Sequence, residues 1–366
     1  MNVVPTLKTE VTGFACLGIT HPHTSGRVKA LQRRSDVAIF GAADDSPLLT
    51  PFAAAFGLEK RTTDEILTDD RVHAVLVHSK SERMADLTIR ALEAGKAVLV
   101  EKPAGRSAAD AKRIVDAVEK TGGLVQVGYC WHFSPAVEAM QSAIRTGRLG
   151  KVLQVRAHAG VSHDEAATAH LNDPADIGGA VFVIGCHMID RILYHFGLPT
   201  SVNARITKFS GYRDVGSRED AAAVVLNYPD KIVTIDFMSW DVLPWAESWE
   251  LTAYGTEGMM TTRVLPASYK VYDSGNHGLP RGWTEWHETS FPEGWAARKT
   301  AYSPELAEID NTIYFDREAA SFLNSLRERT PSAIPASQAF NISRVIEALY
   351  ASSIHGGAET RLDATP

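Results

Sequence analysis

The sequence is poor in the features that mark secreted, membrane-bound and nucleic-acid-binding proteins. Only three of its 366 residues are cysteines, and their wide spacing in apolar stretches fits buried thiols in a reducing compartment. No apolar run approaches the ~18 residues of a membrane helix, and residues 1–10 lack the basic start and apolar stretch of a signal peptide. We therefore expect a cytoplasmic protein with no membrane partner.

An excess of basic residues is also missing. The 37 Lys and Arg residues against 44 Asp and Glu residues give a formal net charge of −7, which offers no electrostatic reason to expect nucleic acid as a partner. Internal repeats and low-complexity tracts are absent from the sequence as well. The length exceeds what one hydrophobic core usually supports, so we expect two domains, residues 1–133 and residues 134–366.

The first domain alternates short apolar runs with helical patterns. Apolar runs typical of buried strands fall at residues 14–18, 37–43, 74–77, 97–100 and 124–127. Continuous apolar strands that alternate with helices predict a parallel sheet covered on both faces. The expected fold class is α/β, with a doubly wound first domain that binds ligands beyond the carboxyl ends of its strands.

The second domain has a different pattern, in which strands follow one another. The expected elements are a strand at 151–160, a long helix at 178–197, strands between 201 and 263 with a hairpin of 221–228 and 232–238, loops at 265–310, and helices near 317–326 and 337–353. Runs of strands predict an α+β domain with a large, mostly antiparallel open sheet. The last helices are expected to pack back on the first domain.

The turn after the first expected strand, residues 18–23, reads GITHPH. Dinucleotide-binding folds place the pattern G-x-G-x-x-G here, so that backbone N–H groups and the helix dipole meet a pyrophosphate. Only Gly18 matches, since Thr20 and His23 occupy the other two places. The motif is weak by itself, yet it makes Gly18, Thr20, His21 and His23 candidate cofactor contacts.

Charged residues follow two other expected strands. Asp44 ends the second strand, where a carboxylate accepts hydrogen bonds from the adenosine ribose and repels a 2′-phosphate, which favours NAD over NADP. Its alternative is a solvated turn. Glu101 and Lys102 end the fourth strand, and an ammonium there can stabilise a developing alkoxide or relay a proton. Their alternative is a surface ion pair.

Residues 91–103, ALEAGKAVLVEKP, closely resemble the signature segment of the glucose–fructose oxidoreductase, inositol dehydrogenase and rhizopine-catabolism (Gfo/Idh/MocA) family. Further segments resemble that family in the same order along the chain: 127–128, 133–135, 147–152, 178–180, 185–190 and 254–258. The resemblance implies a nicotinamide-binding Rossmann domain and a second domain whose open sheet often supports homo-oligomers, here a dimer or tetramer. It also implies hydride transfer at a carbinol carbon of a sugar, sugar derivative or cyclitol.

The resemblance places the family's lysine on Lys102 and its catalytic histidine on His187, and it adds Ser79 and Glu101 to the cofactor contacts. Imidazole titrates near neutral pH, which suits His187 to the role of general base. The alternative is a core histidine that a backbone carbonyl satisfies. The expected cofactor is therefore NAD, with NADP second.

The sequence departs from the family where catalysis is expected. Val183 occupies the place of an aspartate one helical turn before His187, and Asp190 is no clean replacement because the family usually has an acid there too. Other departures are Ser79-Lys80-Ser81 for a usual Thr-Pro-Asn, Cys130 for Asn and His132 for Arg. The proton relay and substrate contacts are therefore expected to include Tyr129, His132, His163 and Asp164.

Two further groups of residues invite a ligand but predict none. His158, His163, Asp164 and His170 have neither the helical i, i+4 spacing nor the short spacings of familiar zinc sites, so no metal is expected. Six tryptophans of the second half can stack on sugars, but core or subunit-interface roles are the simpler interpretation; they are Trp240, Trp245, Trp249, Trp283, Trp286 and Trp295.

Three functions remain open at this point. The first is an NAD-dependent dehydrogenase or reductase of a sugar-like alcohol. The second keeps the cofactor but uses transient oxidation to cleave a glycosidic or related C–O bond. The third is a non-catalytic cofactor-binding paralogue, which Val183 and the altered glycine turn suggest.

Overall fold

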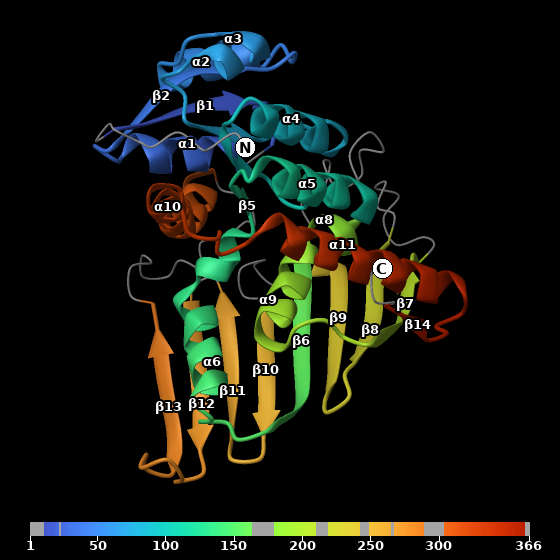
Figure 1. Cartoon of the computed structure of the whole chain (residues 1–366). Helices are drawn as coiled ribbons and strands as arrows, with labels where there is room; N and C mark the ends of the chain where they lie inside the picture. The colour runs from blue at the N-terminus through green and yellow to red at the C-terminus, as the bar shows by residue number, and fades with distance from the viewer. Residues whose placement is uncertain are drawn as a thin grey trace. The chain divides into compact units, whose positions relative to one another are not determined.

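The computed structural model describes residues 11–21, 23–162, 179–209, 219–241, 249–264, 267–288 and 304–362. The chain divides into two compact units, and the figures label their helices and strands (Figure 1). The first unit comprises residues 1–130 and 311–343, and the second comprises residues 131–310 and 344–366. Among the described residues, no helix combines the length and the apolar character that crossing a membrane requires.

The first unit is built on a five-stranded parallel sheet, as the apolar runs predict. Its strands are β1 (Thr12–Leu17), β2 (Val37–Ala43), β3 (Ala74–Val77), β4 (Ala97–Val100) and β5 (Val125–Val127). Their order is β2-β1-β3-β4-β5, and every neighbouring pair is parallel. From β1 the chain first adds β2 on one side, and β3 then lies on the other side of β1, so the direction of strand addition reverses at β1. Ligands bind at such a switch point, beyond the carboxyl ends of the strands.

The helices of the first unit follow from one-sided apolar patterns and local capping. They are α1 (Thr24–Gln32), α2 (Leu49–Phe56), α3 (Thr63–Thr68), α4 (Ser81–Glu93) and α5 (Ala108–Thr121). The sequence patterns above did not predict α2 and α3. A capping box between Thr62 and Glu65 starts α3, and the left-handed Gly57 ends α2, so both signals were local and short.

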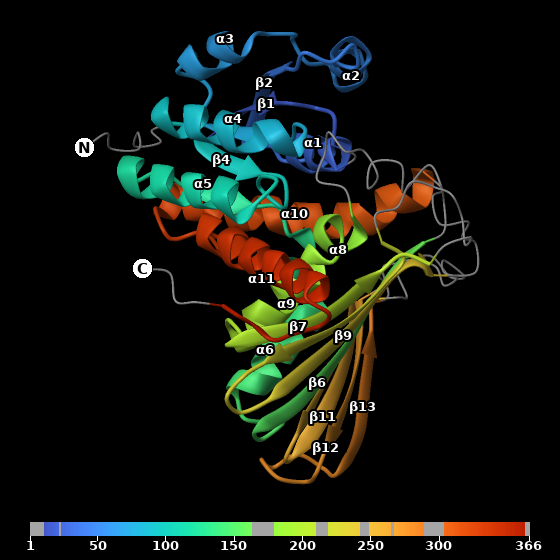
Figure 2. The same ribbon diagram turned by 90° about the vertical axis from the view of Figure 1, so that its right-hand side faces the viewer.

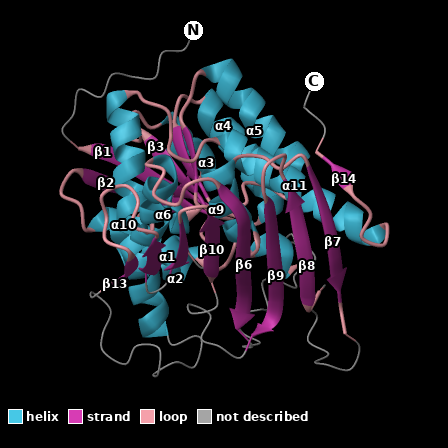
Figure 3. Cartoon of the chain, turned by 90° about the horizontal axis from the view of Figure 1, so that it is seen from below, coloured by secondary structure: helices cyan, strands magenta, loops and turns pink. Residues whose placement is uncertain are grey.

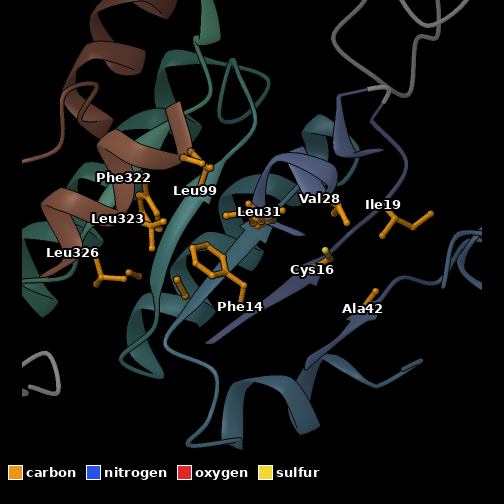
Figure 4. Packing of buried hydrophobic residues seen from close by; sticks show 14 residues of the cluster. Phe14, Cys16, Ile19, Val28, Leu31, Ala42, Leu99, Phe322, Leu323 and Leu326 are labelled. Carbon is orange, nitrogen blue, oxygen red and sulfur yellow. The ribbon is translucent and has the colours of Figure 1, made fainter. Parts of the chain in front are cut away.

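A late segment of the chain completes the hydrophobic core of the first unit. Phe14 of β1, Leu31 of α1 and Leu99 of β4 are in one buried cluster with Phe322 and Leu323 of α10 (Pro304–Glu328) (Figure 4). The rings of Phe14 and Phe322 lie 5.9 Å apart. Truncation of such a buried phenylalanine typically costs about 3–5 kcal/mol, so α10 is an integral part of this unit.

The second unit contains a nine-stranded sheet in the order β13-β12-β11-β10-β6-β9-β8-β7-β14. Its strands are β6 (Val152–Ser162), β7 (Ser201–Thr207), β8 (Ala221–Asn227), β9 (Ile232–Asp241), β10 (Glu250–Gly255), β11 (Gly258–Val264), β12 (Ala267–Asp273), β13 (Gly282–His287) and β14 (Thr360–Arg361). Only β6 and β9 pair in parallel; all other neighbours are antiparallel. Helices α6 (Pro135–Arg145) and α9 (Cys186–Phe196) lie along one face of this sheet (Figures 2 and 3). The predicted fold class is confirmed.

Two expectations about the second unit were wrong. The expected loops at 265–310 include strands β12 and β13 and the start of α10. Aromatic residues at opposed positions stabilise that strand pair, with Tyr269 stacked on Trp286 and Tyr272 edge-on to Trp283. The expected long helix at 178–197 is interrupted, because α8 (Ala180–Val183) ends before α9 begins.

The interruption falls at Gly185. A Cβ at this residue would lie 2.4 Å from the Val181 carbonyl oxygen and 2.8 Å from the Phe237 ring. The close approach of the chain to β9 therefore requires glycine here, and glycine also weakens a continuous helix. The last helix, α11 (Ala336–Ile354), extends from the first unit into the second.

Candidate functional site

The turn after β1 is shaped by Gly18. Its φ of +86° is a left-handed conformation, and a Cβ there would lie 2.6 Å from the backbone nitrogen of Ser79. The Gly18 N–H donates to the Ala43 carbonyl at 2.7 Å. Only glycine permits the turn to approach the segment after β3 this closely. Gly18 and Ser79, both predicted cofactor contacts, therefore touch at the carboxyl edge of the sheet.

Asp44 is fixed beside the same turn. Its Oδ2 accepts a hydrogen bond from the Ile19 N–H at 2.8 Å, and its Oδ1 accepts one from the Ser46 N–H at 2.6 Å. Each carboxylate oxygen retains a second lone pair. The carboxylate is therefore held next to Gly18, where an adenosine ribose is expected, and it can still accept hydrogen bonds from hydroxyl groups.

Helix α1 begins directly after the histidines of the turn. His23 precedes its first residue, Thr24, whose hydroxyl donates to the His21 carbonyl at 2.7 Å. The His23 N–H donates to His21 Nδ1 at 3.2 Å, and the two imidazole rings lie edge-on with centroids 4.6 Å apart. Thr20 is partly buried just before them. The N-terminus of α1 thus meets the edge of the sheet with two imidazoles in place of open glycine backbone.

Both imidazoles face Glu101, which follows β4 at the carboxyl edge of the parallel sheet. His23 Nδ1 lies 3.2 Å from Glu101 Oε1, and His21 Nδ1 lies 3.7 Å from Oε2. The Glu101 side chain is fully buried, and its carboxylate also contacts the guanidinium of Arg27. Burial raises the pKa of a carboxyl group, but Arg27 and the two imidazoles hold the pKa of Glu101 well below its usual range. Glu101 is therefore a buried carboxylate.

Arg27 and Glu318 complete this network, and the sequence patterns did not predict either residue. Arg27 Nε donates to Glu318 Oε2 at 2.6 Å, and Nη2 donates to the Gly128 carbonyl at 2.9 Å. Both charged side chains lie on mostly apolar buried helix faces: Arg27 is beside Val28 and Leu31 on α1, and Glu318 is beside Ala319 on α10. The sequence signal that could have identified each of them was a single charged residue on an otherwise apolar helix face.

Lys102 and His78 occupy the same edge of the first unit. Both side chains are buried, and the peptide bond between Lys102 and Pro103 is cis. Burial lowers the pKa of His78 to about 3, so its ring is neutral at physiological pH. Neither ring nitrogen of His78 has a hydrogen-bond partner within the described part of the chain. Tyr129 is also fully buried in this unit.

The second unit holds His187 on α9. This side chain is buried, and its ring lies against the indole of Trp131, with centroids 4.4 Å apart. Trp131 in turn meets Trp249 edge-on at 4.5 Å. Val183, one turn earlier, is buried and apolar. Aromatic packing thus restrains the His187 imidazole.

Asp190 contacts a different histidine. Its Oδ2 lies 3.3 Å from Nδ1 of His132, whose ring packs on Tyr194 at 4.0 Å. His158 pairs with Asp236 at 2.5 Å on neighbouring strands. His163, Asp164 and His170 lie outside the described residues.

The tryptophans fall into different environments. Trp249 is fully buried, whereas Trp283 is 51% exposed on β13 and stands beside Tyr272. Trp286 stacks on Tyr269. The Trp240 side chain, Trp245 and Trp295 are outside the described part. For the described tryptophans, core and strand-pairing roles account for the contacts.

Sequence comparison identifies both halves of the chain. Residues 16–129 match the model of the oxidoreductase family with an NAD-binding Rossmann fold, and residues 137–261 match the C-terminal domain of the same Gfo/Idh/MocA family. The chain belongs to the Gfo/Idh/MocA oxidoreductase family. The predicted family, the oxidoreductase class and the nicotinamide cofactor are thereby confirmed.

Several relatives of this Gfo/Idh/MocA protein are named dehydrogenases. Scyllo-inositol 2-dehydrogenase (NAD+) of Bacillus subtilis is 27% identical over 79% of this chain and 86% of its own. Trans-1,2-dihydrobenzene-1,2-diol dehydrogenase of Bos taurus is 29% identical over 59% of this chain and 64% of its own. Levoglucosan dehydrogenase of Pseudarthrobacter phenanthrenivorans is 29% identical over 48% of this chain. The match thus spans less than two thirds of the bovine relative and 47% of the levoglucosan enzyme.

Solved structures share the fold over nearly the whole chain. Levoglucosan dehydrogenase in complex with NADH and levoglucosan superposes with a TM-score of 0.81 at 17% identity, covering 96% of this chain and 100% of that one. A structure described as a putative myo-inositol dehydrogenase from Sinorhizobium meliloti 1021 gives 0.76 at 21% identity, with coverage of 96% and 100%. At these identities the likeness establishes the architecture, and substrate remains a separate question.

Proposed function

We propose that this protein transfers a hydride between NAD and a carbinol carbon of a sugar, sugar derivative or cyclitol. The observation that carries the proposal is the position of Asp44, whose carboxylate is hydrogen-bonded to the Gly18 turn at the switch point of a parallel sheet. That position suits the ribose of NAD and disfavours the extra phosphate of NADP. The names of the inositol and levoglucosan dehydrogenases support the substrate class.

The residues at the sheet edge fit a dinucleotide. Gly18 allows the turn to pack closely against Ser79, and the N-terminus of α1 offers backbone N–H groups to a pyrophosphate. We assign cofactor contacts to the turn residues Thr20, His21 and His23, and to Glu101 and Lys102, which follow β4. When bound, the nicotinamide accepts or supplies the hydride.

Lys102 and His187 have the proton-handling roles in this proposal. The His187 imidazole takes the hydroxyl proton of an alcohol substrate as general base, and the Lys102 ammonium stabilises the developing alkoxide. Trp131 restrains the plane of the His187 ring by direct packing, whereas the side chain of Val183 is apolar. Tyr129, His132, His163 and Asp164 are the proposed substrate contacts.

The first test is calorimetric titration of the purified protein with NAD, NADH, NADP and NADPH. We expect the protein to bind NAD and NADH more tightly than NADP and NADPH. A polyol and cyclitol panel then follows, with NADH absorbance as the readout. Cleavage of a glycoside without net NADH would instead support transient oxidation. Nucleotide binding without turnover on the panel would support the non-catalytic paralogue, and absence of binding to all four nucleotides would end the proposal.

A further inference from the structure

We propose that His21, His23 and Glu101 form a binding site for one divalent transition-metal ion of the zinc type. One potential ligand atom from each residue lies within 4.8 Å of the others. This site is distinct from the histidine cluster at residues 158–170, for which the sequence predicts no metal. Its occupancy does not depend on the hydride-transfer reaction proposed above.

The distances between donors match those around a small cation. A tetrahedral ion bound at about 2.0–2.1 Å to nitrogen and oxygen holds its ligand atoms about 3.3–3.5 Å apart. His23 Nδ1 and Glu101 Oε1 are 3.2 Å apart, and His21 Nδ1 and Glu101 Oε2 are 3.7 Å apart. The donors of the three side chains lie within 4.8 Å of one another, so coordination of one ion requires side-chain rotations that bring them closer together. Such an ion would compete with the long hydrogen bond from the His23 N–H to His21 Nδ1.

The neighbouring charged groups act on a bound cation in opposite directions. Arg27 contacts Oε2 of Glu101, but Glu318 offsets its charge through a bond of 2.6 Å to Nε. Lys102 is the cation that opposes binding, as it acts electrostatically on both imidazoles.

A third imidazole, that of His78, lies next to this group. The His78 ring is fully buried and lacks a hydrogen-bond partner within the described residues, although buried polar atoms are ordinarily bonded. Its carbonyl accepts from the His21 N–H at 3.3 Å, and its charge state is coupled to His23 and Glu101. A metal-bound water molecule would give this ring the partner that it lacks.

The donor set selects the class of ion. Two imidazoles and a carboxylate suit Zn²⁺, Co²⁺, Ni²⁺ or Mn²⁺, whereas Mg²⁺ and Ca²⁺ prefer oxygen ligands alone. Three protein ligands leave a coordination position open. Because the site adjoins the N-terminus of α1, that position faces the region where a phosphate oxygen is expected, and this last step rests on the proposed cofactor site.

The test is metal binding by the full-length protein after dialysis against a chelator. Titration with Co²⁺ should give the visible absorption bands of a low-coordinate site at one equivalent, and Zn²⁺ should abolish them with micromolar or tighter affinity. The variants His23→Ala and Glu101→Gln should lose this binding at least ~10-fold, which corresponds to about 1.4 kcal/mol. His277→Ala is the matched control, since His277 pairs with Glu257 at 2.8 Å in the second unit.

Because Glu101 is buried with Arg27, Glu101→Gln is used as a test of metal binding only if its thermal melting curve remains cooperative. If it does not, His23→Ala and His21→Asn provide the test. Absence of Co²⁺ and Zn²⁺ binding by the wild-type protein overturns the inference, as does equal binding by wild type and the His21 and His23 variants. Calorimetry with NAD on the metal-free protein separates the two proposals. NAD binding without metal binding overturns only the metal site, and metal binding without NAD binding overturns only the cofactor assignment.

Discussion

The Arg27 guanidinium and the Glu318 carboxylate form a buried ion pair between residues 291 positions apart in the sequence, with Nε and Oε2 separated by 2.6 Å. The pair links α1, which starts at the candidate cofactor turn, to α10. Arg27 also contacts Glu101 and the Gly128 carbonyl. The position of the site's central carboxylate therefore depends on a helix from the C-terminal part of the chain.

Removal of the Arg27 charge should destabilise the first unit strongly. Arg27→Met leaves Glu101 and Glu318 buried without their cation, and loss of one partner of a buried pair typically costs about 3–5 kcal/mol. Arg33→Met is the matched control, because Arg33 pairs with Asp316 of the same helix α10 at 2.6 Å while both side chains are nearly half exposed. Its loss should be about 0–1 kcal/mol. Urea unfolding measures both, and similar losses would contradict the assigned importance of burial.

Asp44→Asn should reduce the preference for NAD over NADP. The amide retains an acceptor for the Ile19 N–H but removes the charge that repels a 2′-phosphate, so we expect the ratio of the two affinities to fall ~10-fold or more. Asp45→Asn is the control, since Asp45 is exposed and pairs with Arg83. Calorimetry with both nucleotides measures the ratio. An unchanged ratio in the Asp44 variant would move the ribose contact elsewhere.

Lys102→Ala and His187→Ala should each lower turnover about 10²–10⁴-fold with little change in substrate affinity, as expected for proton-handling groups. Initial rates of NADH formation on the best polyol provide the measurement, and thermal melting checks folding. His158→Ala is a control on a histidine that pairs with Asp236 in the large sheet. Rates close to those of wild type in both variants would end the assigned roles.

His195 should make the second unit less stable in mild acid. Burial, with Arg191 and His132 nearby, holds the pKa of His195 well below its ordinary value. Below about pH 6.5 the unfolded chain binds a proton at His195 that the native state excludes. The free energy of unfolding therefore decreases as the pH is lowered, by up to about 1.4 kcal/mol per pH unit from this group. The stability is fully present above that pH. Urea unfolding of His195→Gln between pH 7.5 and 5 should show a shallower slope; a slope equal to that of wild type would refute the assignment.

The sequence predicted those parts of the fold that depend on local pattern. Apolar runs predicted the five strands of the first sheet within one or two residues, because a parallel strand buried on both faces is apolar throughout. Strands β12 and β13 were missed because polar and charged residues, such as the cross-strand pair Lys270 and Glu285, leave no apolar run or clear alternation in this segment.

The candidate site was predictable residue by residue but not as a network. The turn at Gly18, the acid at Asp44 and the Glu101-Lys102 pair each follow a recognisable strand end. No sequence pattern shows that His21 and His23 turn toward Glu101, because that geometry depends on the packing of α1 on the sheet. The partner of Arg27 was equally hidden, since periodicity indicates which face of α10 is buried but not what it meets.

The place of α10 in the first core has a consequence for biosynthesis. All five strands of the parallel sheet have been synthesised once Val127 is made, yet Phe322 and Leu323 of the same core follow about two hundred residues later. At a translation rate of roughly 5–20 residues per second, about 10–40 s pass between synthesis of the last strand of the sheet and synthesis of these α10 residues. During that interval the apolar surface around Phe14 is not covered by α10, so the first core is incomplete until Phe322 and Leu323 have been synthesised.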